Sequence, residues 1–159
     1  MKIEPLGPQH DRGAFSCGVA QIDEFLFACS PEVLSPDDRI YVAVDADGAV
    51  LGFYGLRAAI WEVRSGKSVK HRHAELELSM MGVRHDRQSQ GIGAALANDA
   101  FERVLDVVGM IGGIQRLWLG ALNARAQRFY ERTGFSPLGD SLRMVILIDE
   151  IADALSAAE

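Results

Sequence analysis

The chain has 159 residues, of which 48% are hydrophobic and 24% are charged, as in an ordinary globular protein. This length fits one domain, 1–159, whose core would bury roughly two thirds of the surface of the unfolded chain. The net charge of −6 argues against a surface wholly dedicated to nucleic acid. No apolar run approaches the roughly 20 residues of a membrane span, and residues 1–5 lack the apolar core of a signal peptide. We therefore expect a cytoplasmic protein without a membrane partner.

The chain contains two cysteines, Cys17 and Cys29. In the cytoplasm they are expected to be reduced thiols rather than a disulfide. Neither has a His or Cys neighbour at the spacing of metal ligands, so the sequence predicts no metal site.

Apolar periodicities predict a mixed α/β fold. Strands are predicted at 3–6, 39–44, 49–56, 75–80, 117–122 and 144–148. Helices are predicted at 17–29, from near Gly91 to 107, at 124–133 and at 149–158. Turn residues should end the first helix at Pro31 and the Ser35-Pro36-Asp37-Asp38 cluster. Asp45–Gly48 should form a hairpin turn, with Gly48 at the position that needs a positive φ.

The segment 57–73 has an unusual charge. It holds five basic residues and one acidic residue, Glu62, which gives a local charge of +4. Residues 60–63 either continue the preceding strand or start another, and the basic part after them is expected to be a loop. Such a cluster is either a solvated face or an anion-binding site. The basic residues are Arg57, Arg64, Lys67, Lys70 and Arg72.

The most informative stretch, Gln88–Gly93, reads Gln-Ser-Gln-Gly-Ile-Gly. It follows the apolar run 78–83 and precedes the helix from near Gly91. Two glycines let successive N–H groups converge at a helix N-terminus, where unpaired amides and the helix dipole favour an anion such as phosphate. A tight turn with no ligand is the alternative.

A second segment, 123–135, reads as a complete helix. Asn123 is a good N-cap and Gly134 a typical terminator. Three arginines recur on one face of this helix, where they would meet either a polyanion or solvent. They are Arg125, Arg128 and Arg132.

The two motifs, Gln-x-x-Gly-x-Gly and Asn-x-x-Ala-x-x-Phe-Tyr-x-x-x-Gly-Phe, closely resemble the acyl-CoA-binding core of the GNAT N-acetyltransferases in order, spacing and context. The resemblance implies an α/β fold with a central, mixed but mostly antiparallel sheet that is flanked by helices and splayed at the acyl-CoA site. It also implies acetyl-CoA as co-substrate, with no metal, and a primary amine as acceptor.

By this resemblance, amides of the first motif bind the pyrophosphate and Arg87 adds charge. The strand before it offers the backbone of Met81 and Val83 to the pantetheine arm, and Gly82 suits a bulge or a close backbone approach. The implied cofactor-binding residues are Met81, Gly82, Val83, Arg87, Gln88, Ser89, Gln90, Gly91, Ile92, Gly93, Asn123, Phe129 and Tyr130.

The resemblance also implies the catalytic residues. The Tyr130 hydroxyl would protonate the departing thiolate as general acid, although a Tyr that only packs or binds cofactor fits too. Glu77 would accept the amine proton, or Glu75 and Glu77 are plain surface carboxylates. Asn123 either contacts the cofactor arm or only caps its helix, and Phe129 is either core or cofactor wall.

The N-terminal part narrows the resemblance. Phe15–Gly18, Ile22–Leu26 and Gly52–Leu56 are similar to motifs of the GNAT toxins, which acetylate the amino group of aminoacyl-tRNA and are neutralised by a ribbon-helix-helix antitoxin. In contrast to the toxins, Met80 stands where they typically carry Arg, and the chain is acidic. Acetylation of a protein or small-molecule amine, and a non-catalytic acyl-CoA-binding regulator, are the alternatives. A homodimer would be common among similar proteins.

Overall fold

The computed structural model describes residues 1–30 and 37–157 and has an α/β architecture. The predicted breaks at Pro31, Ser35 and Pro36 and the predicted helix end at Ala158 lie outside the described residues. The elements are β1 (Lys2–Pro5), α1 (Ala20–Ala28), β2 (Arg39–Val44), β3 (Val50–Ser65), β4 (Ser68–Val83), the short 3-10 helix η1 (His85–Arg87), α2 (Ile92–Met110), β5 (Arg116–Gly120), α3 (Ala124–Arg132), β6 (Ser136–Pro137), β7 (Arg143–Leu147) and α4 (Ile148–Ser156).

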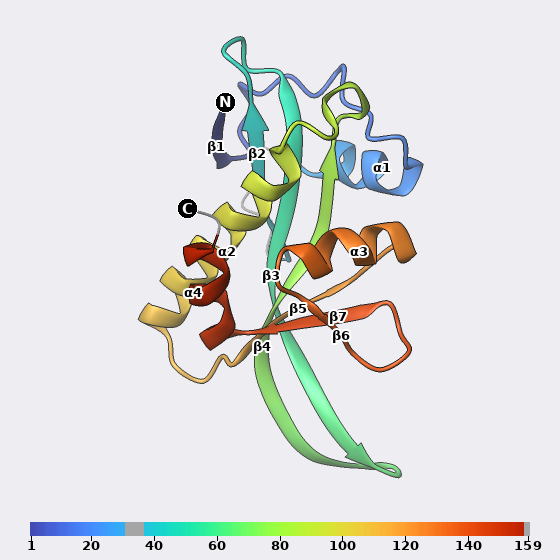
Figure 1. Cartoon of the computed structure of the whole chain (residues 1–159), viewed down its shortest axis with the longest axis vertical. Coiled ribbons are helices and arrows are strands. Elements are labelled where there is room, and N and C mark those ends of the chain that lie inside the picture. The colour runs from blue at the N-terminus through green and yellow to red at the C-terminus, as the bar shows by residue number, and fades with distance from the viewer. Residues whose placement is uncertain (31–36, 158–159) are drawn as a thin grey trace. The chain divides into compact units, whose positions relative to one another are not determined.

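The strands form one sheet in the order β1-β2-β3-β4-β5-β7-β6, labelled in Figure 1. β4 and β5 run parallel, whereas the pairs β1–β2, β2–β3, β5–β7 and β6–β7 are antiparallel. The predicted mixed, mostly antiparallel sheet is therefore confirmed. In the described residues no helix is both long and apolar enough to cross a bilayer.

The chain divides into two compact units. The first consists of Met1–Arg57 and Leu78–Ala100, and the second of Ala58–Glu77 and Phe101–Glu159. The predicted splay of the sheet would involve segments of both units and stays a prediction.

The first unit packs helix α1 on strands β2 and β3. Leu26 and Phe53 are fully buried, and the Phe53 ring meets Phe15 edge-on at 5.5 Å and stacks with Phe25 at 6.1 Å between ring centroids. The hairpin turn at Asp45–Gly48 is confirmed, with Gly48 at φ +82°.

In the second unit, apolar residues of adjacent strands share one sheet face. Leu76, Leu117 and Ile146 lie opposite one another in β4, β5 and β7 and are all buried. Their neighbours along each strand therefore project to the other sheet face. At the buried face the ring of Phe135 contacts Phe101 of α2 at 5.7 Å.

The basic segment 57–73 is not a loop. β3 continues to Ser65 and β4 starts at Ser68, so the segment forms the two arms of a hairpin that turns at Gly66, with φ +60°. In Figure 1 the end of this hairpin extends beyond β5 and β7 of its own unit. The prediction of a loop was wrong because charge was taken as a sign of irregular structure, whereas an exposed hairpin can carry charges on both faces.

Other boundaries differ by smaller amounts. Helix α1 begins at Ala20, three residues later than predicted, because Gly18 has φ +88° and the Asp23 carboxylate accepts hydrogen bonds from Cys17 N and Ser16 Oγ, both at 2.8 Å. These contacts give a structural reason for part of the segment Phe15–Gly18, which resembles a motif of the GNAT toxins. The two-residue strand β6 was not predicted.

Candidate functional site

The turn before α2 presents a run of backbone amides to solvent. Ser89 and Gly91 have φ of 62° and 82°, and the first bond of the helix runs from Ala95 N to Gly91 O at 3.0 Å. Within the described part of the chain, no amide from Ser89 to Ala94 donates to a protein group. Ser89, Gln90 and Gly91 are exposed, and a Cβ at Gly91 would meet no atom within 4 Å. This amide cradle, residues 89–94, suits an anion at the N-terminus of a 19-residue helix.

Gln88 has a different place from the one predicted. Its side-chain amide donates to the carbonyl oxygens of Cys17 at 3.0 Å and Val83 at 3.1 Å, and its backbone N–H donates to His85 O at 3.4 Å. Gln88 therefore ties the turn to the N-terminal segment, and its side chain holds the amide cradle in position. Nothing in the local sequence pattern indicated this contact.

Arg87 is exposed beside the amide cradle, but its charge is shared. Its Nε lies 3.8 Å from Asp86 Oδ2, and the same carboxylate pairs with Arg84 at 2.7 Å. The two arginines hold the pKa of Asp86 below its usual value. This carboxylate weakens the attraction of an anion to Arg87.

Gly82 is required by packing. A Cβ there would lie 2.7 Å from Ile22 Cγ2 and 3.1 Å from Phe53 Cε1. Strand β4 can therefore lie this close to α1 only because residue 82 is glycine. Of the two predicted reasons for Gly82, a bulge or a close backbone approach, this contact supports the close approach. Met81 and Val83 are half-buried on the same stretch of β4. Their pairing with a pantetheine arm stays a prediction.

Asn123 caps helix α3. Its Oδ1 accepts from Ala126 N at 3.0 Å, and the helix ends with Gly134 at φ +108°. Both predicted helix signals are confirmed. The capping contact occupies one acceptor of the side chain and leaves its amide donors for another partner.

Tyr130 is buried on α3. Its ring meets Phe129 at 5.1 Å and Phe135 at 5.8 Å, both edge-on. Burial raises the pKa of its hydroxyl above the ordinary value of 10.0. The hydroxyl therefore stays protonated at neutral pH, as a general acid must before it gives up its proton. Phe129 is half-buried, so its ring belongs partly to the packing of this helix.

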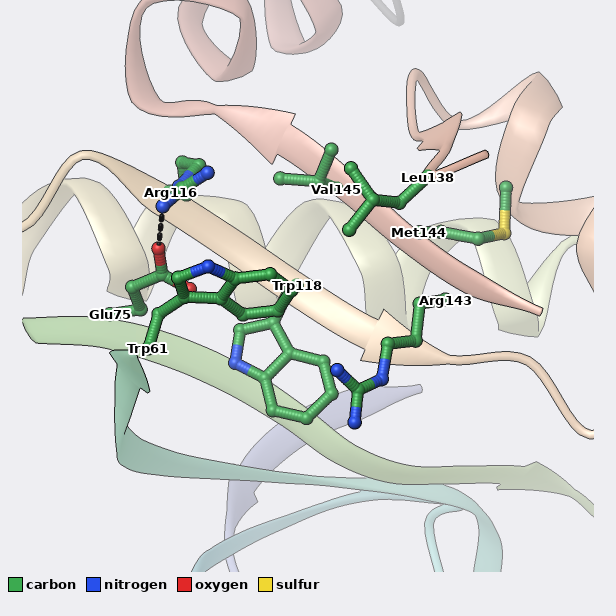
Figure 2. A pocket seen from close by; sticks show the side chains of 8 residues that line it. All are labelled: Trp61, Glu75, Arg116, Trp118, Leu138, Arg143, Met144 and Val145. Atoms are coloured by element: carbon green, nitrogen blue, oxygen red, sulfur yellow. Dashed lines mark ion pairs between the residues drawn. The ribbon is translucent and has the colours of Figure 1, made fainter. Parts of the chain in front are cut away.

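Glu75 and Glu77 are buried, with 2% and 8% of their surface exposed, so the alternative of plain surface carboxylates was wrong. Glu75 forms an ion pair with Arg116, drawn as a dashed line in Figure 2. Glu77 lies opposite Trp118 in the parallel register with β5. The hydrophilic residue type had suggested exposure, whereas the side chains of Trp61, Arg116 and Trp118 line a pocket together with Glu75.

The predicted residues fall into two groups. The first unit brings together Met81–Val83 and the turn Arg87–Gly93, and the second unit contains Glu77 and the helix with Asn123, Phe129 and Tyr130. Among residues 1–30 and 37–157 no group of three His, Cys, Asp or Glu side chains could hold a metal ion.

Comparisons with known proteins agree with these features. The model of the acetyltransferase (GNAT) domain family matches residues 36–137. A probable toxin TacT from Sinorhizobium fredii is 31% identical over 94% of this chain and 92% of its own. Two solved structures, AtaTR bound with AcCoA and AtaT complexed with acetyl-methionyl-tRNAfMet, are each 25% identical to this chain with a TM-score of 0.81. Each match covers 95% of this chain, and the matches cover 95% and 96% of the two solved chains, respectively. The predicted resemblance to the GNAT toxins is confirmed, and the chain belongs to the GNAT acetyltransferase family.

Proposed function

We propose that this GNAT acetyltransferase moves an acetyl group from acetyl-CoA to the amino group of aminoacyl-tRNA. The observation that carries the proposal is the similarity, over nearly the full length of both chains, to the probable toxin TacT and to AtaT complexed with acetyl-methionyl-tRNAfMet. We propose a single catalytic domain, 1–159, acting in the cytoplasm, where aminoacyl-tRNA is found.

The amide cradle supports acetyl-CoA as the donor. Its free N–H groups and the positive end of α2 would hold the pyrophosphate, and Ser89, Gln90, Gly91, Ile92 and Gly93 would contribute backbone rather than side chains. The Gln88 side chain would hold the amide cradle in position through its hydrogen bonds to Cys17 O and Val83 O. Met81 and Val83 would offer backbone groups to the pantetheine arm.

The reaction needs two proton movements. The acceptor amine attacks the thioester carbonyl carbon, a C–N bond forms, and the C–S bond of the tetrahedral intermediate breaks. Glu77 would accept the proton that the amine loses, and the Tyr130 hydroxyl would give its proton to the departing thiolate. The buried Tyr130 hydroxyl is protonated at neutral pH, which is the state this role requires.

Helix α3 supports a polyanionic acceptor in spite of the net charge of −6. Arg125, Arg128 and Arg132 are exposed and form no ion pair with any residue that the structure describes. Uncompensated cations of this kind are what phosphate neutralisation requires.

The same similarity supports a protein partner. One solved relative, 25% identical with a TM-score of 0.78, is a mutant form of the toxin AtaT bound to the C-terminus of the antitoxin AtaR and acetyl-CoA. We propose that a ribbon-helix-helix antitoxin neutralises this chain, and that the active form is a homodimer. Light scattering of the purified chain and co-purification with the product of an adjacent gene test these two points.

The direct test of the acceptor is transfer of labelled acetyl groups. Wild type and Tyr130→Phe are incubated with labelled acetyl-CoA and, separately, aminoacyl-tRNA, deacylated tRNA and a lysine-containing peptide. We expect label in aminoacyl-tRNA alone, released with the amino acid by mild base. Label in the peptide alone would make the acceptor a protein amine, and binding of acetyl-CoA without transfer to any amine would make the chain a regulator.

A further inference from the structure

The two tryptophans of the chain meet on the sheet face of the second unit that is opposite its core. Trp118 lies in β5 between the buried residues Leu117 and Leu119, so its side chain projects away from them. Trp61 of β3 meets it with ring centroids 6.4 Å apart and planes at 73°. Both indoles are half-buried, so part of each ring system reaches solvent.

Arg143 of β7 lies beside both indoles. Its guanidinium carbon lies 5.6 Å from the ring centroid of Trp61 and 5.5 Å from that of Trp118. Figure 2 shows the guanidinium beside the two indoles, with the ion pair of Arg116 and Glu75 at the other end of the cluster. We call Trp61, Trp118 and Arg143 the indole–arginine cluster.

The two arginines that lie over the indoles, Arg116 and Arg143, differ in how their charge is compensated. Arg116 is neutralised by the buried Glu75 and also lies over Trp61, at 5.5 Å from the ring centroid. Arg143 is exposed, and no described carboxylate forms an ion pair with it. Its planar cation is therefore held in place by the indoles rather than by an anion, and it remains available to a ligand.

The hairpin between Trp61 and Glu75 adds further positive charge. Arg64 and Arg72 share the single carboxylate of Glu62. Lys67 and Lys70 are exposed and have no ion-pair partner among the described residues. The second unit thus combines aromatic rings, a planar guanidinium and uncompensated cations on adjoining strands.

We infer that the indole–arginine cluster is a stacking site for an unpaired nucleotide of the RNA acceptor, with phosphates neutralised by the neighbouring hairpin. Proteins recognise single-stranded RNA by stacking bases on aromatic rings and on guanidinium planes, while Lys and Arg neutralise the backbone. An acidic peptide would use the charges but not the planar stacking surface. The inference rests on the proposed aminoacyl-tRNA acceptor and adds the residues that hold its unpaired end.

Intrinsic fluorescence reports on this site directly, since Trp61 and Trp118 are the only tryptophans in the chain. The probes are a single-stranded RNA hexamer, a blunt RNA duplex and a polyglutamate peptide, each titrated at equal anionic charge. We expect saturable quenching by the hexamer and much weaker quenching by the duplex and the peptide. Equal quenching by all three would overturn the stacking site, as would fluorescence that changes only with protein concentration, which would mean that a second copy covers this face.

Variants separate stacking from charge. Arg143→Lys keeps the positive charge and removes the planar guanidinium. We expect it to bind the hexamer about tenfold more weakly than wild type, in keeping with the loss of one stacked base. We expect the same loss for Trp118→Ala. Lys2→Gln, which removes an exposed cation of the first unit, is the matched control and should bind as wild type. Arg143→Lys is the decisive variant because it leaves no cavity, whereas Trp118→Ala does. Hexamer binding by Arg143→Lys equal to that of wild type would overturn the inference.

Kinetics distinguish a failure of this inference from a failure of the proposed function. With aminoacyl-tRNA as acceptor, Arg143→Lys should raise KM about tenfold and leave kcat unchanged. If wild type acetylates aminoacyl-tRNA and Arg143→Lys has the same KM, the stacking site is wrong and the proposed function stands. If wild type does not acetylate aminoacyl-tRNA, the proposed function fails, and the inference fails with it because its acceptor is lost.

Discussion

Glu77 of β4 lies directly opposite Trp118 of β5 in the parallel register of the sheet. Residues opposite each other in neighbouring strands project to the same face, so the carboxylate proposed as proton acceptor shares its face with the indole–arginine cluster. Leu76 and Leu117, one residue earlier in each strand, are buried on the other face. The second unit therefore has one polar, aromatic sheet face and keeps its core on the opposite side.

The two carboxylates of β4 should respond differently to substitution. Glu75→Gln removes the charge that compensates Arg116 inside the structure, so we expect the free energy of unfolding to fall by about 2 kcal/mol. Glu77→Gln should instead reduce kcat with little change in stability or in affinity for acetyl-CoA. Urea unfolding and steady-state kinetics of both variants check this pair. An unchanged kcat for Glu77→Gln would remove Glu77 from the mechanism.

Tyr130→Phe should lower kcat by at least about 10²-fold, because the thiolate would leave without a proton donor. The phenyl ring keeps the contacts with Phe129 and Phe135, so the fold and the binding of acetyl-CoA should be preserved. Single-turnover transfer assays measure the effect, with Tyr41→Phe as a matched loss of a hydroxyl from a ring that stacks on Tyr54. Equal rates for Tyr130→Phe and wild type would mean that Tyr130 only packs.

Cys17 should make stability fall at alkaline pH. Burial, helped by the nearby Asp23, raises the pKa of its thiol from the ordinary 9.0 to about 11. Between these two values the unfolded chain releases the proton while the folded chain keeps it, so stability decreases as pH rises from 9 to 11. Cys17→Ala should flatten this part of the curve in urea unfolding at several pH values. A slope that Cys17→Ala leaves unchanged would contradict the assignment.

Local signals in the sequence predicted local structure well. The cap at Asn123, the terminator at Gly134 and the hairpin turn at Gly48 depend on one or two residues each, and all are present. Features that join distant segments were not predictable in this way. The contact of Gln88 with Cys17 depends on the tertiary fold rather than on a local period.

The polar residues of β4 show the same limit. Glu75 and Glu77 are buried, although residue type alone indicated the opposite. Trp61 and Arg116, which line a pocket with Glu75, and Trp118, which lies opposite Glu77, come from other strands. Trp61 and Trp118 likewise meet only through the order of the strands. The fold class followed from apolar periodicity and the family from two motifs, whereas the surroundings of the site required the structure.

The claim that the turn before α2 binds the pyrophosphate of acetyl-CoA is tested most directly by calorimetric titration of acetyl-CoA into wild type, Gly91→Glu and Gly109→Glu. Gly109 is an exposed residue near the other end of α2, where a Cβ would also meet no atom, so its variant controls for the added charge. We predict binding by wild type and Gly109→Glu, and loss of binding by a folded Gly91→Glu, because its carboxylate would enter the amide cradle. Undiminished binding by Gly91→Glu, or no binding by wild type, would contradict the account.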